Sequence, residues 1–203
     1  MEIRDPIHGA MSVEPAEEPL VDHPFVQRLR HILQTGFSEL PFPGATHTRY
    51  AHSLGAMHLS GQAFDSAFES WDLDPGVRQR FRALVRVAAL CHDLGHAPFS
   101  HCTEFAMPPL VDLGITWYDR PVAPGRRACH EDYTIAILER SSLARTIEEN
   151  FPFTARHVAA LVSLEVSVED DFFVVGGVDH RRVLSQIISS ELDVDRLDYL
   201  VRD

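Results

Sequence analysis

Residues 83–101 constrain the fold of this chain more than any other stretch. The segment ALVRVAAL, at 83–90, has the apolar pattern of a buried helix, and it runs directly into CHDLGHAPFSH at 91–101. Three histidines and an aspartate therefore follow the point where an interior helix ends. Polar and charged groups are costly to bury without partners. The stretch therefore predicts a functional site, because a segment that only fills a core has no need of these side chains.

Apolar residues recur at helical spacing through most of the remaining chain. A helix is predicted from Asp22 to Gly36, with Asp22 as its cap and Pro24 in its first turn. Further helices are predicted over 50–69, from Pro75 to His92, and over 129–138, 143–149, 154–164 and 181–203. Residues 1–21 contain short β-like pieces that indicate a small hairpin, residues 106–128 are irregular, and residues 168–180 read as an exposed loop or hairpin. We predict a mainly α (all-α) fold, organised as one domain over 1–203.

The composition excludes several classes of protein. The formal net charge of −12 and the pI of about 5.4 disfavour nucleic acid as the main partner, since an acidic surface repels phosphate backbones. The cysteines Cys91, Cys102 and Cys129 lack C-x-x-C spacing, which favours a reducing compartment. The first residues do not resemble a signal peptide, and no apolar run reaches the ~20 residues that cross a bilayer. We expect a cytoplasmic protein without membrane association.

Four potential metal ligands occur in the order H…HD…D on three predicted helices. They are His52, His92, Asp93 and Asp195. Imidazole and carboxylate together suit Mn, Mg, Fe, Zn or Ni, and side chains from separate helices can meet in the core of a bundle. The alternative is a set of satisfied polar groups in the core. Because burying this many without a common partner is costly, we predict a site for one divalent metal ion.

The sequence around these residues resembles the HD-domain phosphohydrolase superfamily, in the branch of the deoxynucleoside triphosphate triphosphohydrolases. The matching pieces, in family order, are DPIHG, FVQRLRHILQTG, FPGATHTRYAHSLG, CHDLGHAPFSH, CHED and ELDVDRLDYLVRD. A single HD pair is common by chance, whereas six ordered pieces that span nearly the whole chain are not. The resemblance implies an HD-domain helical bundle, and it implies that His52, His92, Asp93 and Asp195 are the metal ligands.

The resemblance also implies roles for residues around the metal. Arg49 corresponds to an arginine that holds substrate phosphate, and His96, His101 and His130 correspond to histidines used for proton transfer or phosphate contact. Gln34, Asp193, Arg196, Tyr199 and Asp203 correspond to residues that contact the triphosphate and the sugar. The alternatives are capping or surface histidines and an exposed helix face. Gly95 and Pro98 indicate that the chain turns after His92, so that His96 and His101 enter the pocket from a loop.

Several positions depart from the family pattern. Thr35 stands where relatives carry leucine beside the sugar, Glu104 where an aspartate is common near the third pocket histidine, and Arg196 where many relatives have lysine. The sequence stops at YLVRD, where relatives continue with helices that close the pocket. The expectation is that the chain is a fragment or that this lid is absent.

The resulting hypothesis is a metal-dependent phosphohydrolase that splits a deoxynucleoside triphosphate into deoxynucleoside and triphosphate. One alternative is another HD-type nucleotide phosphatase or phosphodiesterase, with the same metal site and a different pocket wall. The other is a regulatory module that senses a nucleotide without turnover. In each case the partner is a nucleotide, and the resemblance implies a homo-oligomer.

Overall fold

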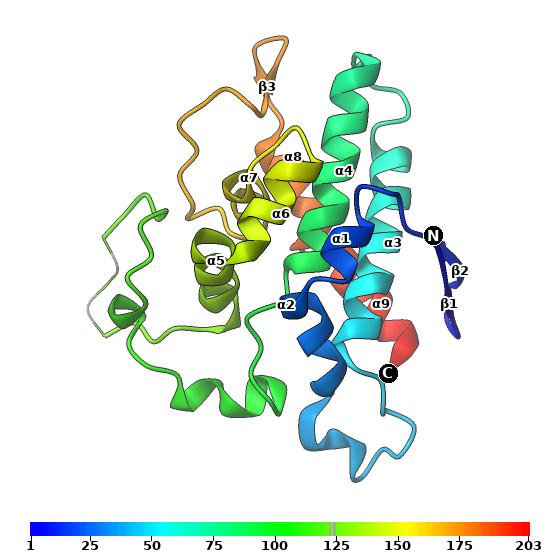
Figure 1. Ribbon diagram of the computed structural model, residues 1–203, viewed down its shortest axis with the longest axis vertical. Helices are drawn as coiled ribbons and strands as arrows, with labels where there is room; N and C mark the ends of the chain where they lie inside the picture. Colours follow the sequence, from blue (N-terminus) through cyan, green and yellow to red (C-terminus); the bar gives the residue numbers. More distant parts are fainter. Residues whose placement is uncertain (122, 124) are drawn as a thin grey trace.

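The computed structural model describes residues 1–121, 123 and 125–203, and helices dominate this part of the chain (Figure 1). The α-helices are α1 (Glu18–Val21), α2 (Pro24–Gln27), α3 (Arg49–Ala67), α4 (Pro75–Cys91), α5 (His130–Arg140), α6 (Ser142–Asn150), α7 (Ala155–Val162), α8 (Arg181–Ile188) and α9 (Val194–Arg202). Short 3-10 helices are η1 (Arg28–His31), η2 (Gly36–Glu39), η3 (Ser100–Ala106) and η4 (Leu110–Leu113). The strands are β1 (Glu2–Asp5), β2 (Gly9–Ser12), β3 (Val174–Val175) and β4 (Val178–Asp179). The predicted mainly α fold is confirmed.

The two longest helices, α3 and α4, lie side by side at the centre of the fold (Figure 1). Helix α3 also packs against α9, and α4 packs against α7 and α8. Their inward faces join one apolar cluster that includes Phe64, Phe81, Leu84 and Leu161. This packing brings the C-terminal end of α4 near α3 and α9, although the three helices are distant in sequence. Organisation as a single domain stays a prediction. No helix among the described residues has the length and hydrophobicity needed to span a membrane.

The long helices begin where short polar side chains supply caps. Thr48 Oγ1 accepts a hydrogen bond from Ala51 N at the start of α3, and Asp74 Oδ1 accepts one from Gly76 N at the start of α4. Pro75 occupies the first turn of α4. A backbone N–H at this position has no partner within the helix, so proline, which lacks this group, costs no hydrogen bond. These caps satisfy amide groups that have no partner within the helix. The predicted beginnings of both helices are confirmed to within one residue.

The single helix predicted from Asp22 to Gly36 is wrong. The chain forms the short helix α2 and then the 3-10 turn η1, and it is extended from Ile32. The cap of α2 is His23 and not Asp22, because His23 Nδ1 accepts from Phe25 N. The Arg28 side chain explains part of the break, since it donates to the carbonyl oxygens of Leu94 and His96 at 3.0 and 2.6 Å. The segment thereby holds the loop that follows His92.

The single helix predicted over 181–203 is also wrong, because it consists of two helices. Helix α8 ends at Ile188, and α9 begins at Val194. Between them, the Asp193 carboxylate accepts hydrogen bonds from Arg196 N and Ser190 N, at 2.8 and 2.6 Å. Aspartate at this position caps a new helix and ends the previous turn. The break changes the direction of α9 and places its first turn beside α3.

Two antiparallel hairpins complete the described structure. Strands β1 and β2 pair with Glu2 opposite Ser12 and Asp5 opposite Gly9, which confirms the N-terminal hairpin. Strands β3 and β4 form a second hairpin around Gly176 and Gly177, in the stretch predicted to be a loop or hairpin. The irregular stretch over 106–128 contains η4, and residues 122 and 124 within it lie outside the described residues.

The cap of α2 leads to a prediction about stability at acid pH. His23 is 8% exposed, its Nδ1 accepts from Phe25 N, and its Nε2 lies 3.0 Å from Ser142 Oγ. Burial lowers the pKa of His23 below its ordinary value of 6.5. The unfolded chain therefore takes up a proton first as the pH falls below 6.5. The free energy of unfolding then decreases by up to about 1.4 kcal/mol per pH unit for this group.

Thermal unfolding of His23→Asn between pH 7 and pH 5 tests this prediction. Asparagine retains an oxygen that caps the helix and does not titrate, so we expect the Tm of the variant to fall less than that of the wild type over this range. His31→Asn is the control, because His31 is exposed. Parallel Tm curves for the wild type and His23→Asn would contradict the assignment.

Candidate metal and active site

Two imidazoles and a carboxylate from three helices converge at the centre of the molecule. His52 lies on α3, His92 directly follows α4, and Asp195 is in the first turn of α9. His52 Nε2 is 3.0 Å from Asp195 Oδ1 and 3.4 Å from His92 Nε2, and His92 Nε2 is 3.7 Å from Asp195 Oδ1. Ligand bonds of about 2.0–2.2 Å allow two donor atoms of one ion to lie at most about 4 Å apart. All three separations fit a common divalent ion.

The outer nitrogens of both imidazoles contact acceptors. His52 Nδ1 lies 2.7 Å from Asp198 Oδ2, and His92 Nδ1 lies 2.7 Å from the carbonyl oxygen of Ala89. Each contact places a proton on Nδ1, so that Nε2 presents a lone pair in the neutral imidazole. Two Nε2 atoms therefore face the same space in the tautomer that binds metals.

Asp93 brings a second carboxylate to the same place. Its Oδ1 lies 3.3 Å from His92 Nε2, and its Oδ2 lies 3.7 Å from His52 Nε2. Asp93 Oδ2 also accepts a hydrogen bond from Arg49 Nη1. The structure thus brings together His52, His92, Asp93 and Asp195, the four residues that the sequence singled out. Their donor set, two nitrogens and carboxylate oxygens, fits a borderline or hard divalent cation.

The electrostatics of this cluster favour positive charge. Burial alone would lower the pKa of His92, but Asp93 and Asp195 raise it to about 9. Burial alone would raise the pKa of each aspartate, but the neighbouring histidines, with Arg49 beside Asp93, hold both pKa values below the ordinary value of 3.8. Two carboxylates thus stay ionised in a site that is largely buried. A cation between them would offset their charge.

Arg49 is fixed by the protein on three sides. This residue is 2% exposed; besides Asp93 it donates to Ser100 Oγ at 2.9 Å and to the carbonyl oxygen of Gln34 at 3.5 Å. Ser100 and the preceding Phe99 have φ values of 54° and 69°, a region that non-glycine residues rarely occupy. Ser100 also donates to the carbonyl oxygens of Leu33 and Gln34. Arg49 and Ser100 thus anchor the strained turn that carries His101 toward the site.

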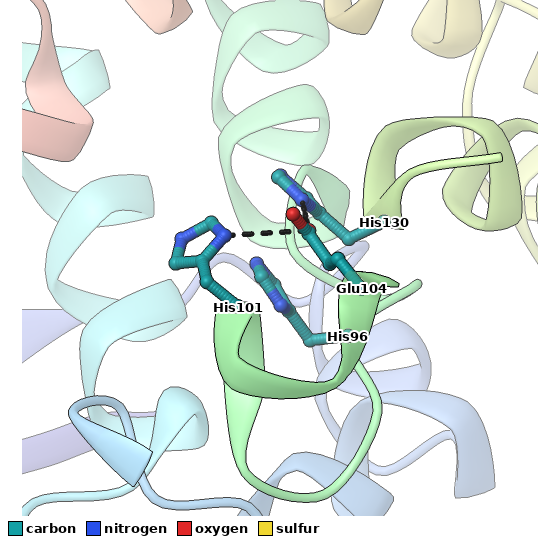
Figure 2. A group of neighbouring side chains, drawn as sticks. All are labelled: His96, His101, Glu104 and His130. Carbon is teal, nitrogen blue, oxygen red and sulfur yellow. Dashed lines mark hydrogen bonds and ion pairs between the residues drawn. The ribbon is translucent and has the colours of Figure 1, made fainter. Parts of the chain in front are cut away.

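A second cluster of side chains lies next to the first and contains His96, His101, Glu104 and His130 (Figure 2). His101 and Glu104 project from η3, His130 from the beginning of α5, and His96 from the loop after α4. Glu104 Oε1 lies 2.5 Å from His130 Nδ1 and 3.3 Å from His101 Nδ1. The prediction that His96 enters the pocket from a loop after His92 is confirmed, whereas His101 enters it from η3.

The rings of His96 and His130 are stacked, with centroids 3.9 Å apart and planes 14° from parallel. The lone pairs of imidazole nitrogens lie in the ring plane, so those of two stacked rings lie in nearly parallel planes and do not converge on one ion. Burial lowers the pKa of His96 to about 4, although Asp93 acts in the opposite direction. His96 is therefore neutral at physiological pH. This geometry suits hydrogen bonds to an anion or to water better than a second metal ion.

A cavity of about 230 Å³ connects the two clusters. Nine of the residues predicted for the site line it: Gln34, Arg49, His92, Asp93, His96, His101, His130, Asp195 and Tyr199. His52 is fully buried behind them. The cavity is thus lined by three potential metal ligands, His92, Asp93 and Asp195, together with three further histidines and an arginine. This arrangement is able to bind a phosphate group beside a cation.

Three predicted substrate residues lie outside this cavity lining. Asp193 is used as the cap of α9, and Arg196 is exposed on the same helix. Asp203 Oδ1 lies 3.1 Å from His47 Nε2. Their predicted contacts with substrate stay predictions.

The residues that hold the site in place were not singled out from the sequence. Asp198 lies behind His52, Ser100 behind Arg49, and Arg28 behind the loop of His96. A signal existed for Asp198, because it follows Asp195 by three residues and shares its helix face. Gly95 also has a packing role, since a Cβ there would lie 1.9 Å from the carbonyl oxygen of His130. Because Gly95 has no Cβ, α5 can approach the loop closely enough for His130 to stack on His96.

Comparisons with known proteins identify relatives of this chain. The profile of the HD domain matches residues 49–203. The chain is 31% identical over 214 residues to deoxynucleoside triphosphate triphosphohydrolase SAMHD1 of Gallus gallus, covering 98% of this chain and 33% of that protein. It is 33% identical over 207 residues to the Homo sapiens protein of the same name, covering 99% and 32%. A hypothetical protein from Aquifex aeolicus has a crystal structure with a TM-score of 0.70 and 28% identity, covering 100% of this chain and 45% of that one. The chain thus spans about a third of the length of these curated relatives.

Proposed function

Because this chain belongs to the HD domain family, we propose that it is a metal-dependent phosphohydrolase that acts on nucleotides. The observation that carries the proposal is the convergence of His52, His92 and Asp195 on one point, with Asp93 beside them. This point opens into the cavity lined by Arg49 and the three histidines. A divalent ion held there would be Mn, Mg, Fe, Zn or Ni, all of which accept nitrogen and oxygen ligands.

The proposed chemistry divides between the ion and the protein. A bound divalent ion supplies Lewis acidity toward a phosphoryl oxygen and lowers the pKa of water. Asp93 and Asp195 provide the negative charge that holds a cation, and Arg49 keeps Asp93 in position. Arg49 also lines the cavity, where its guanidinium can offset charge on a phosphate.

The histidine cluster is the proposed source of the proton for the leaving group. The side chain of His101 is 65% exposed, so it can exchange protons with water while it faces the cavity. Glu104 lies between His101 and His130 and orients both rings. His96 is neutral and fully enclosed, and it can hydrogen-bond a phosphoryl oxygen only as a donor from one ring nitrogen. General acid catalysis of this kind contributes about 10²–10⁴-fold.

A deoxynucleoside triphosphate is the proposed substrate. The support comes from the relatives, which are described as deoxynucleoside triphosphate triphosphohydrolases, and from the basic and imidazole groups around the cavity. At about 230 Å³ the cavity is smaller than the ~300–1,000 Å³ of most small-molecule sites. Its volume suits the phosphate end of a nucleotide. We propose that Gln34 and Tyr199, on the cavity lining, face the sugar.

The test is product analysis with a panel of nucleotides in the presence of Mn²⁺. Deoxynucleoside triphosphates, ribonucleoside triphosphates, mono- and diphosphates, and a dinucleotide diester are incubated separately with the protein, and the products are resolved by ion-exchange chromatography. Tripolyphosphate and deoxynucleoside in equal amounts are the expected products. Orthophosphate alone would instead establish a nucleotide phosphatase, and release of a nucleoside monophosphate from a diester would establish a phosphodiesterase.

His101→Asn is the matched variant for this assay. It removes the proposed proton donor and leaves His52, His92, Asp93 and Asp195 unchanged, so we expect bound Mn²⁺ to be retained while kcat falls about 10²–10⁴-fold.

The wild type is also assayed with Mg, Fe, Zn or Ni in place of Mn. Nucleotide binding by the wild type without turnover in any of these five metals would contradict the enzyme proposal and favour a sensing module.

A further inference from the structure

Asp198 is a completely buried carboxylate directly behind the proposed metal site. It is 0% exposed and belongs to α9, one turn after Asp195. Its Oδ2 lies 2.7 Å from His52 Nδ1, on the side of the ring that faces away from the cavity. Asp198 does not itself belong to the proposed ligand set, so its position calls for a separate explanation.

Two residues at the N-terminus of the chain take part in holding Asp198. His8, in the turn between β1 and β2, places Nε2 2.6 Å from Asp198 Oδ1. Arg202 donates to both oxygens of Asp198, at 2.8 Å each, and to Asp5 Oδ2 at 2.9 Å. Asp5 Oδ1 in turn accepts the backbone N–H of His8 at 3.0 Å. We call Asp5, His8, Asp198 and Arg202 the hairpin clamp.

The packing of α3 against α9 is adapted to the hairpin clamp. Gly55 lies on α3 one turn after His52, and a Cβ at this position would lie 1.9 Å from Asp198 Oδ1 and 2.6 Å from Arg202 Nη2. A side chain here would displace the clamp, so the glycine is needed for the close approach. The sequence pieces DPIHG and LDYLVRD thereby meet at the same point, although they are separated by almost the entire chain.

We propose that the N-terminal hairpin turn is a positioning element of the metal site. Asp198 accepts the Nδ1–H of His52 and so directs the Nε2 lone pair toward the ion, while His8 and the Asp5–Arg202 pair fix the Asp198 carboxylate. A carboxylate behind a metal-binding imidazole fixes its tautomer and increases its basicity. Asp5 and His8 lie outside residues 49–203, to which the HD domain profile extends. The inference rests on the proposed metal site and does not depend on the substrate.

The alternative is that the hairpin clamp only fastens the hairpin to the helices. Both roles predict lower stability when the clamp is broken, so stability cannot separate them. The two roles differ in the metal affinity that they predict for the folded variants. A positioning role requires weaker metal binding when a donor to Asp198 is lost and recovery when the donor is restored, whereas a fastening role leaves the metal affinity of the folded protein unchanged.

The experiment is titration calorimetry with Mn²⁺, in the absence of nucleotide, on the full chain. His8→Phe keeps a ring without an N–H donor, and His8→Gln restores a donor. We expect the dissociation constant for Mn²⁺ to rise about tenfold or more in His8→Phe and in Asp5→Asn, and to recover in His8→Gln, since loss of such outer partners costs about 10–100-fold. The unfolding temperature of each metal-free variant confirms that it is folded.

His157→Phe is the matched control. His157 is also buried and pairs with Asp170 at 3.0 Å, but it lies on α7 and contacts neither the cavity nor the hairpin clamp. This variant is expected to lose stability and to keep the wild-type Mn²⁺ affinity. Equal Mn²⁺ affinity in His8→Phe and the wild type would overturn the inference alone. Failure of the wild type to bind any divalent ion would overturn the proposed function together with it.

Discussion

Replacing Asp195 with alanine is expected to remove the bound metal ion and the phosphohydrolase activity together. Asp195 Oδ1 lies 3.0 and 3.7 Å from the Nε2 atoms of His52 and His92, and its loss leaves these imidazoles without their shared carboxylate. We expect kcat to fall by more than about 10–100-fold, which is the loss that follows removal of a residue hydrogen-bonded to a metal ligand. Metal content by elemental analysis and turnover of nucleotide measure the two losses.

The choice of Asp195 avoids confusion with misfolding. Its side chain is 38% exposed, so alanine leaves no large cavity, and Asp198 and Asp93 remain beside His52 and His92. Glu191→Ala is the control, because it removes an exposed carboxylate just before the cap of α9. Full metal content in Asp195→Ala would contradict the ligand assignment, and loss of metal in Glu191→Ala would show that the effect is not local.

Arg49→Met is expected to destabilise the metal-free protein strongly and the metal-bound protein much less. Asp93 and Arg49 are 4% and 2% exposed, and removing one partner of a buried ion pair costs about 3–5 kcal/mol. Protonated His92 lies 3.3 Å from Asp93 Oδ1 and offsets part of this cost. A divalent ion would offset more, since it adds positive charge beside the same carboxylate. Urea unfolding with and without Mn²⁺ measures the difference.

A double variant separates the ion pair from the packing of the arginine side chain. In Arg49→Met with Asp93→Leu both charges are absent, and replacing both partners of a buried pair by apolar groups is close to neutral. We expect the double variant to be more stable than Arg49→Met without metal and to gain nothing from Mn²⁺. An equal gain from Mn²⁺ in the double variant would contradict a role for Asp93 in binding the ion.

The helices could be predicted where apolar periodicity coincided with a local cap. Thr48 and Asp74 directly precede the two central helices, and their side chains accept the capping hydrogen bonds. The predictions failed where hydrogen bonds of a polar side chain accompany a break in a periodic pattern, and these bonds are long-range for Arg28 and local for Asp193. Arg28 turns away to the carbonyl oxygens of Leu94 and His96, and Asp193 divides the last helix in two. In each case the pattern of apolar residues continues through a break made by hydrogen bonds.

The residues of the candidate site divide in the same way. His52, His92, Asp93 and Asp195 could be singled out because their residue types are rare in a core without a partner, and the structure brings all four together. The supporting roles of Asp198, Ser100 and the N-terminal turn were not predicted, because each acts through a contact with a residue at least 50 positions away. For Asp193 the sequence predicted a contact with substrate, and the structure shows that its carboxylate caps α9.

The class of fold, the two central helices that carry His52 and lead to His92, and the chemical character of the site could all be inferred from the amino-acid sequence. These follow from residue type and short-range spacing, which act along the chain. The three-dimensional packing was needed to show which nitrogen of each imidazole faces the cavity, that Arg49 is bonded on three sides within the protein, and that the first hairpin contacts the carboxylate behind His52. Such contacts depend on the direction in which packed helices approach one another, and that direction is set by the whole core.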